Sequence, residues 1–254
     1  MKVVGIIPAR YASTRFPGKP LALIKGKPMI QRVYEQATKS KLDAIVVATD
    51  DIRIADAVKD FGGQYVMTDP NHRSGTDRCR EALELLEGCY DAVVNIQGDE
   101  PFIDPAQINQ IVDLILKDDT MLASLAKRIE AEEELFSPNT VKVVMNKQGN
   151  ALYFSRNPIP FMRNIDSKEW LTQGTFYKHI GIYAYKSDTL RRIASMSPSV
   201  LETAESLEQL RWLENGLSIS MGVTEVENVS IDQPGDIEKA ERFADNQMKT
   251  TETK

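Results

Sequence analysis

Short apolar segments alternate with longer amphipathic segments along the first half of the chain. The apolar ones are Val3–Ile7, Ala44–Thr49 and Asp91–Ile96, and a shorter one covers 64–67. Between and after them, apolar residues recur at helical spacing. This spacing predicts helices over 28–39, 51–61, 75–86 and 105–116. Such alternation is typical of a parallel sheet with helices on both faces, so we predict an α/β, doubly wound, mostly parallel sheet.

The pattern changes after Met121. Strand-like segments now follow one another closely, at 141–145, 151–155 and 178–185, which predicts a smaller antiparallel part that acts as a lid or an interface. Helices resume from Leu201 to Asn215, a last strand is expected at 217–223, and Pro234 marks a helix start. We therefore predict a single domain over 1–254, with 121–200 as a subdomain and 246–254 as a disordered tail.

Composition excludes several classes of protein. No apolar run approaches the ~18 residues of a membrane span, and the run after Lys2 ends at Pro8, too early for a signal peptide. We therefore expect a cytoplasmic protein without a membrane partner. The formal net charge of -6 argues against a nucleic-acid partner, because proteins that bind nucleic-acid backbones usually carry a basic face.

The first loop is cationic although the protein is acidic. The chain carries seven Lys and Arg and no Asp or Glu between Met1 and Tyr34, and Arg10, Arg15 and Lys19 lie in the loop itself. Neither a Walker loop nor a GxGxxG fingerprint is present. Cations at this spacing can wrap a triphosphate and supply charge-assisted hydrogen bonds, although chance surface composition is the alternative.

Two carboxylates follow strand-like segments elsewhere in the chain. Asp99 lies in QGDEP and Asp232 in IDQP, and each is placed to hold Mg²⁺ at the edge of the sheet. The alternative for either residue is a helix cap or a turn. With the cationic loop, the pair favours phosphoryl or nucleotidyl transfer. A non-catalytic nucleotide-binding module is the competing reading, but a pure binder does not need two metal carboxylates.

A series of sequence strings resembles one enzyme family. IIPARYASTRFPGKPL, ATDD, SGTDR, VNIQGDEP, VKVV, ALYFSR, HIGIYAY, LEQLR and IDQPGD occur in order from about Val3 to Phe243. They are similar to the 3-deoxy-manno-octulosonate cytidylyltransferases, the CMP-Kdo synthetases of lipopolysaccharide synthesis. The resemblance implies a nucleotidyltransferase-like fold, a homodimer, and a Mg²⁺-dependent reaction of CTP with 3-deoxy-D-manno-octulosonate (Kdo) that gives CMP-Kdo and pyrophosphate. A cytidylyltransferase for another acidic sugar, such as sialate, is the second candidate.

The same resemblance implies roles for individual residues. Lys19, Arg10, Asp99 and Asp232 would be catalytic, and the last two would bind the metal. Without the resemblance, a histidine such as His179 is more often a hydrogen-bonded core or interface residue, and the alternative for Ser74 is a plain helix cap. The implied nucleotide-binding residues are Ala9, Arg10, Arg15, Lys19, Ser74, Arg78 and Gln97, and the implied sugar-binding residues are Gln97, Arg156, His179, Glu208 and Gln209.

Overall fold

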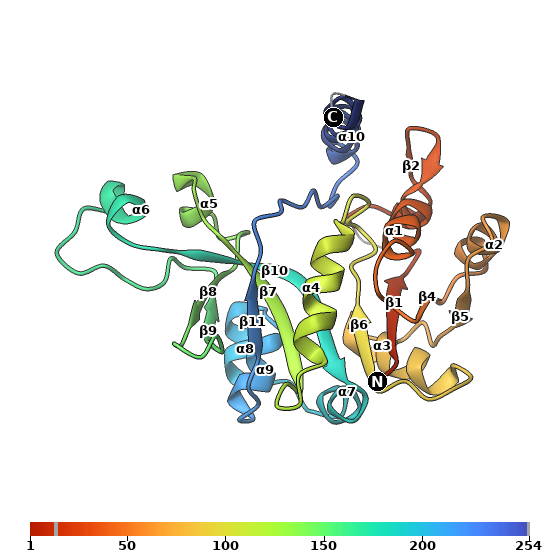
Figure 1. Ribbon diagram of the computed structural model, residues 1–254, viewed down its shortest axis with the longest axis horizontal. Coiled ribbons are helices and arrows are strands. Elements are labelled where there is room, and N and C mark those ends of the chain that lie inside the picture. Colours follow the sequence, from red (N-terminus) through yellow and green to blue (C-terminus); the bar gives the residue numbers. More distant parts are fainter. Residues whose placement is uncertain (13–14, 253–254) are drawn as a thin grey trace. The chain divides into compact units, whose positions relative to one another are not determined.

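The computed structural model describes residues 1–12 and 15–252, with 246–252 described by their backbone alone (Figure 1). The chain forms two compact units. Unit 1 contains Met1–Val112 and the segment from Glu227 onward, and unit 2 contains Asp113–Val226. Unit 2 therefore interrupts unit 1 in the sequence and includes the segment 121–200 that we expected to form a subdomain. Its action as a lid stays a prediction.

Unit 1 is built on four parallel strands in the order β6-β1-β4-β5. In the central pair, Val4 of β1 lies opposite Ala44 of β4, and most apolar side chains of the two strands are buried because helices cover the sheet. The doubly wound α/β prediction is confirmed. The strands of unit 1 are β1 (Val3–Ala9), β4 (Ala44–Thr49), β5 (Tyr65–Met67), β6 (Ala92–Asn95) and a hairpin of β2 (Leu23–Ile24) and β3 (Lys27–Pro28).

The predicted helices of the first half are all present. One boundary matters for function, because β1 runs through Pro8 to Ala9 and so delivers Arg10 directly at the strand end. The helices are α1 (Met29–Ala37), α2 (Ile52–Asp60), α3 (Gly75–Leu85), α4 (Pro105–Ile115), which crosses into unit 2, α10 (Asp236–Glu252) and the 3₁₀ turn η1 (Lys19–Leu21).

The C-terminal segment differs from its prediction. Helix α10 continues through Glu252, so the backbone of 246–252 is helical where we expected disorder; residues 253–254 lie outside the described residues. Gln and Lys in this stretch are good helix formers and extend a helix that has already begun. At its start the helix packs Ala240 and Ala244 against Ile24, Met29 and Phe102 beneath the first loop.

Unit 2 adds the predicted antiparallel strands. β10 pairs with both β7 and β8, β8 pairs with β9, and β11 runs parallel to β7. The unit contains β7 (Leu122–Arg128), α5 (Glu132–Phe136), β8 (Lys142–Met145), β9 (Ala151–Ser155), the turn η2 (Ser167–Glu169), α6 (Trp170–Gln173), β10 (Tyr177–Lys186), α7 (Ser187–Ala194), α8 (Val200–Glu205), α9 (Gln209–Glu214) and β11 (Ser220–Val223).

The sequence reasoning missed strand β7 and the short helices α5, α6 and α7. The sequence of β7, LASLAKR, contains Ala and Ser, which are poor strand formers, and it becomes a strand because partners pair with it on both sides. The helical stretch after Leu201 is two helices, separated at Ser206, whose φ of 53° is left-handed. Among the described residues, no helix is long and apolar enough to cross a membrane.

Candidate functional site

A cavity of about 250 Å³ lies at the carboxyl ends of β1 and β6 in unit 1. The loop after β6 passes close to the end of β1, and Gly98 permits this approach because a Cβ there would lie 2.8 Å from the Pro8 carbonyl oxygen. Most of the predicted triphosphate and metal residues therefore share one cavity. Its lining consists of Pro8, Ala9, Arg10, Arg15, Lys19, Pro20, Gln97, Gly98, Asp99 and Asp232.

Lys19 makes polar contacts with both carboxylates of this cavity. Its Nζ donates to Asp99 Oδ2 at 2.8 Å and to the Ile231 carbonyl oxygen at 2.9 Å, and it lies 3.8 Å from Asp232 Oδ1. Arg15 Nη2 lies 3.2 Å from the same Asp232 oxygen; the Arg15 side chain is largely exposed and that of Asp232 about half exposed. Cations from the first loop thus face two carboxylates across a space open to solvent.

Backbone hydrogen bonds bring the distant Asp232 to Asp99. The Ile231 N–H donates to the Asp99 carbonyl oxygen at 3.0 Å, and Asp236 accepts from the Asp232 N–H at 3.1 Å. Asn228 Nδ2 donates to Glu100 Oε2 at 2.8 Å, which anchors the start of the same segment. Burial, reinforced by the charge of Asp99, raises the pKa of Glu100 to about 7. The segment 228–236 follows unit 2 in the sequence, so its position beside Asp99 is visible only in the folded chain.

The paired carboxylates fit a hard cation. Within the described ranges 1–12 and 15–252, no cluster of three or more His, Cys, Asp or Glu side chains is arranged to hold a metal. Mg²⁺ does not need one, because it commonly takes one or two carboxylates and fills its other positions with phosphate oxygens and water. Asp99 and Asp232 therefore match magnesium together with a phosphate ligand better than a closed, all-protein metal site.

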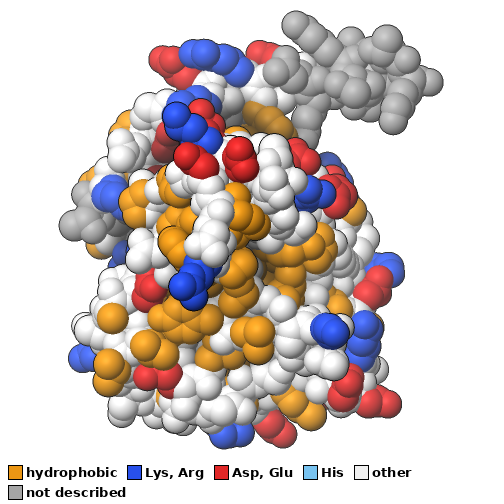
Figure 2. Space-filling view, turned by 90° about the vertical axis from the view of Figure 1, so that its left-hand side faces the viewer, with side chains coloured by type: hydrophobic (Ala, Val, Ile, Leu, Met, Phe, Trp, Pro, Cys, Tyr) orange, Lys and Arg blue, Asp and Glu red, His pale blue; other side chains and the backbone are white. Residues whose placement is uncertain are grey.

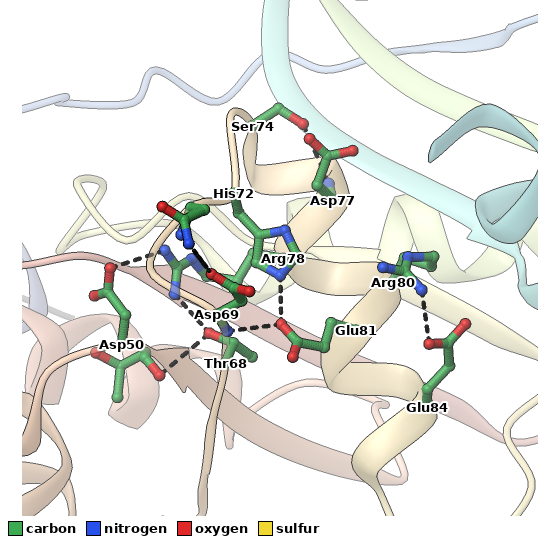
Figure 3. A network of polar contacts seen from close by, with 12 residues as sticks. Asp50, Thr68, Asp69, His72, Ser74, Asp77, Arg78, Arg80, Glu81 and Glu84 are labelled. Carbon is green, nitrogen blue, oxygen red and sulfur yellow. Dashed lines mark hydrogen bonds and ion pairs between the residues drawn. The ribbon is translucent and has the colours of Figure 1, made fainter. Parts of the chain in front are cut away.

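A second cavity, of about 180 Å³, shares Pro8, Ala9 and Arg10 with the first. Here Ser74 is the N-cap of α3, and its Oγ accepts from the Asp77 N–H at 3.1 Å, as the helix-cap reading predicted. Arg78 is buried, and Figure 3 shows its guanidinium between Asp50 and Thr68. The sequence reasoning did not single out two further lining residues, His72 and Arg73, although HRSGT precedes α3 directly.

The predicted sugar-binding residues are divided between the units. Gln97 lines the first cavity in unit 1, and the other four belong to unit 2. Arg156 caps α8 there, with its guanidinium donating to the carbonyl oxygens of Pro138, Glu205 and Ser206. Gln209 is buried, and Glu208 lies close enough to Tyr183 to raise the pKa of that buried phenol further, beyond the larger effect of burial. Their contact with a sugar stays a prediction.

His179 is enclosed by Ser124 and aromatic rings. Its Nε2 lies 2.9 Å from Ser124 Oγ, and its ring centroid is 5.1 Å from Phe154 and 5.2 Å from Tyr183. Burial lowers the pKa of His179 to about 3, so the imidazole is neutral at physiological pH. These contacts agree with the core reading of this histidine and leave its sugar contact untested.

The neutral His179 predicts a pH-dependent stability. The unfolded chain binds a proton at this residue below about pH 6.5, whereas the folded chain does so only near pH 3. Stability is therefore lost as the pH falls from 6.5 towards 3. Between pH 7 and 5 we expect His179→Gln to remove about 2 kcal/mol of this dependence. Urea unfolding of both proteins at each pH measures it, and identical pH dependence in the two would contradict the prediction.

Comparison with known proteins places this geometry in a family. The cytidylyltransferase family profile matches residues 4–219. A 3-deoxy-manno-octulosonate cytidylyltransferase of Parabacteroides distasonis is 58% identical over 250 residues, which cover 97% of this chain and 99% of the relative. The chain belongs to the 3-deoxy-manno-octulosonate cytidylyltransferase family. A relative of the same name from Cytophaga hutchinsonii is 55% identical over 239 residues, covering 93% of this chain and 95% of that protein.

Solved structures agree with the family and with the fold. A CMP:2-keto-3-deoxy-manno-octonic acid synthetase in complex with CTP superposes with a TM-score of 0.90 at 42% identity, covering 97% of this chain and all of that one. The 4-diphosphocytidyl-2C-methyl-D-erythritol synthase of Anaerococcus prevotii has a TM-score of 0.63 at 15% identity, covering 96% of this chain and 99% of that one, a likeness of fold alone. The resemblance stated from the sequence strings to the cytidylyltransferase family is confirmed.

Proposed function

We propose that this protein transfers CMP from CTP to the anomeric hydroxyl of Kdo, giving CMP-Kdo and pyrophosphate for lipopolysaccharide synthesis. The observation that carries the proposal is the first cavity, in which Arg10, Arg15 and Lys19 face Asp99 and Asp232. Its charges suit a nucleoside triphosphate with a divalent cation, and the chain belongs to a family named for this reaction.

In this reaction the sugar hydroxyl oxygen attacks the α-phosphorus, loses its proton, and displaces pyrophosphate. Lys19 is a compact point charge, and its place between the two carboxylates lets it donate to the oxygens that gain charge during attack. Arg10 and Arg15 are exposed at the cavity, where their guanidinium groups can grip phosphate oxygens bidentately. These residues hold the triphosphate in position and stabilise its charge, which is most of the catalysis in such transfers.

We propose Mg²⁺ as the cofactor, held by Asp99 and Asp232. When bound, it would neutralise charge on the triphosphate and on the departing pyrophosphate. Lys19 forms ion pairs with both carboxylates and Arg15 with Asp232, so cations lie directly beside both proposed metal ligands. The donor set, two carboxylates beside a triphosphate-sized cationic loop, supports magnesium over softer metals.

Two alternatives from the sequence have less support. A sialate-specific enzyme is disfavoured because the similar full-length relatives carry the Kdo name. A non-catalytic nucleotide-binding module is disfavoured because it would not need Asp232 carried back to Asp99 from the far end of the chain. Neither alternative accounts for both the family and the paired carboxylates.

A homodimer and a cytoplasmic location stay predictions. Unit 2 has apolar side chains on its surface, with Phe161 75% exposed and Leu152 60% exposed, and Figure 2 shows a broad group of hydrophobic side chains on the face viewed from the side of α6. Such a patch supports an interface between copies of the chain. In contrast, Ile180, Ile182 and Tyr185 of β10 are buried. Light scattering after size exclusion tests the dimer.

A pyrophosphate-release assay tests the activity. Purified protein is incubated with CTP, Kdo and Mg²⁺, and parallel reactions replace Kdo with sialate or omit the sugar. We expect pyrophosphate and CMP-Kdo only where Kdo is present. Release with sialate at an equal kcat/KM would support the alternative sugar, and unaltered CTP in every reaction would overturn the proposed function.

A further inference from the structure

Two basic side chains that line the second cavity, Arg78 and His72, each contact a carboxylate. Arg78 has a side chain only 4% exposed, and its guanidinium donates to Thr68 Oγ1 at 2.5 Å and to Asp50 Oδ2 at 3.2 Å. The Thr68 hydroxyl in turn donates to the Thr49 carbonyl oxygen at 3.2 Å. Figure 3 shows this chain of contacts at one side of α3. Asp50 and Thr68 thus fix the plane of the guanidinium and leave its other N–H groups available.

His72 is held in the same way by Glu81, on the next turn of α3. A short contact joins His72 Nε2 to Glu81 Oε2, which also accepts from the Asp69 N–H at 2.8 Å. Burial alone would raise the pKa of Glu81, but hydrogen bonds from the Asp69 N–H and from His72 outweigh it and keep the pKa below its usual range. Glu81 is therefore an anion that only accepts hydrogen bonds.

The anionic Glu81 determines the tautomer of His72. Because a carboxylate cannot donate, its hydrogen bond with His72 requires a proton on Nε2, and in this tautomer Nδ1 is left as an acceptor. Nδ1 points away from Glu81 in Figure 3, and within the described part of the chain it has no hydrogen-bond partner. His72 and Arg78 both line the second cavity. The cavity thus contains one fixed acceptor and one fixed set of donors.

This arrangement matches one pyrimidine and not the other. Cytosine has acceptors at O2 and N3 and a donor in its exocyclic 4-amino group, whereas uracil has a carbonyl acceptor at position 4 and a donor at N3. A guanidinium can donate to O2 and N3 of cytosine, and a neutral imidazole nitrogen can accept from the amino group. Against uracil, two of these positions would place donor against donor or acceptor against acceptor, which costs more than losing a contact.

We propose that Asp50 and Glu81 are positioning residues that make the second cavity selective for a cytosine nucleotide over a uracil nucleotide. Glu81 holds His72 Nδ1 as the acceptor for the exocyclic amine, and Asp50 holds Arg78 as the donor to the acceptor edge of the base. The inference rests on the proposed function in one respect, because it assigns the second cavity to the base of the nucleotide.

Direct binding tests this selectivity without any sugar or turnover. Isothermal titration of CTP and of UTP, each with Mg²⁺, compares the natural protein with Glu81→Gln, Asp50→Asn and Glu84→Gln. Glu84 lies on the same helix but is exposed, and it pairs only with Arg80, at 2.7 Å, which makes it the matched control. A glutamine amide can turn either its oxygen or its nitrogen to His72, so it no longer requires the imidazole proton to lie on Nε2. We expect the CTP-over-UTP preference to fall about tenfold in Glu81→Gln and Asp50→Asn and to stay unchanged in Glu84→Gln.

Kinetics with Kdo separate positioning from a merely structural role. Positioning predicts a raised KM for CTP with kcat within roughly twofold of the natural value. The proposal is overturned if the natural protein binds both nucleotides equally, if both variants keep the CTP preference, or if they lose affinity for both nucleotides equally together with a lower melting temperature. Preferential CTP binding without pyrophosphate release would instead refute the proposed function and leave the base selectivity standing.

Discussion

Replacing Asp99 with Asn is expected to lower kcat for pyrophosphate release by about 10²- to 10³-fold. The change removes one of the two proposed Mg²⁺ carboxylates and the 2.8 Å ion pair that positions Lys19. The amide keeps the size of the side chain, and the backbone contact from Ile231 to the Asp99 carbonyl oxygen does not involve the altered group. The fold should therefore persist, as circular dichroism and a melting curve would report.

Asp56→Asn is the matched control for this prediction. Asp56 is exposed on α2 in the same unit, away from the residues that line either cavity, so its replacement should leave kcat unchanged. Varying the Mg²⁺ concentration adds a second readout, because weaker metal binding should raise the concentration needed for half-maximal rate. Retention of a substantial part of the natural kcat in Asp99→Asn at every Mg²⁺ concentration would refute the metal role of this residue.

Replacing Lys142 with Met is expected to lower the free energy of unfolding by about 2–4 kcal/mol. Lys142 is fully buried in unit 2, and its ammonium group donates to the carbonyl oxygens of Ser137 at 2.8 Å, of Thr140 at 2.6 Å and of Arg156 in a short contact. Methionine fills a similar volume but donates nothing, so three carbonyl oxygens lose their partner. Urea unfolding at pH 7 measures the loss.

Lys147→Met provides the comparison for the buried lysine. Lys147 is exposed in the turn between β8 and β9, so the same substitution there should change stability by less than ~0.5 kcal/mol. Equal effects at the two positions would show that the carbonyl contacts of Lys142 contribute nothing to stability. Because the segments that carry Ser137 and Arg156 flank β8 and β9, we also expect faster amide exchange there in Lys142→Met.

Strong local patterns allowed much of unit 1 to be predicted. Apolar runs such as Ala44–Thr49 became strands with the predicted bounds, because their side chains are β-branched or small and both faces of the sheet are covered. Strand β7 was not predicted because its own residues have a weak strand preference. It is a strand because β10 and β11 pair with it on either side. The tail from Asn246 was misjudged because helix extension from α10 needs little local preference once the helix exists.

The candidate site was only partly accessible to the same reasoning. Arg10, Arg15 and Lys19 are close in the sequence, so their convergence on one loop followed from spacing alone. The role of Arg156 in capping α8 was not visible, because the three carbonyl groups that it contacts come from two different segments. His72 was passed over for a related reason, since its partner Glu81 becomes a neighbour only once α3 forms and the preceding loop folds back on it.

The sequence alone determined the alternation of strands and helices, the cationic first loop and the family, because each is written in residues that are adjacent or regularly spaced. Only the tertiary structure decided that Asp232 reaches Asp99 and Lys19, through hydrogen bonds formed after the chain returns from unit 2. It also decided that Asp50 contacts Arg78 and that Glu81 contacts His72. Charge balance and hydrogen-bond direction depend on distances of a few ångströms between remote segments, and such distances exist only in the folded chain.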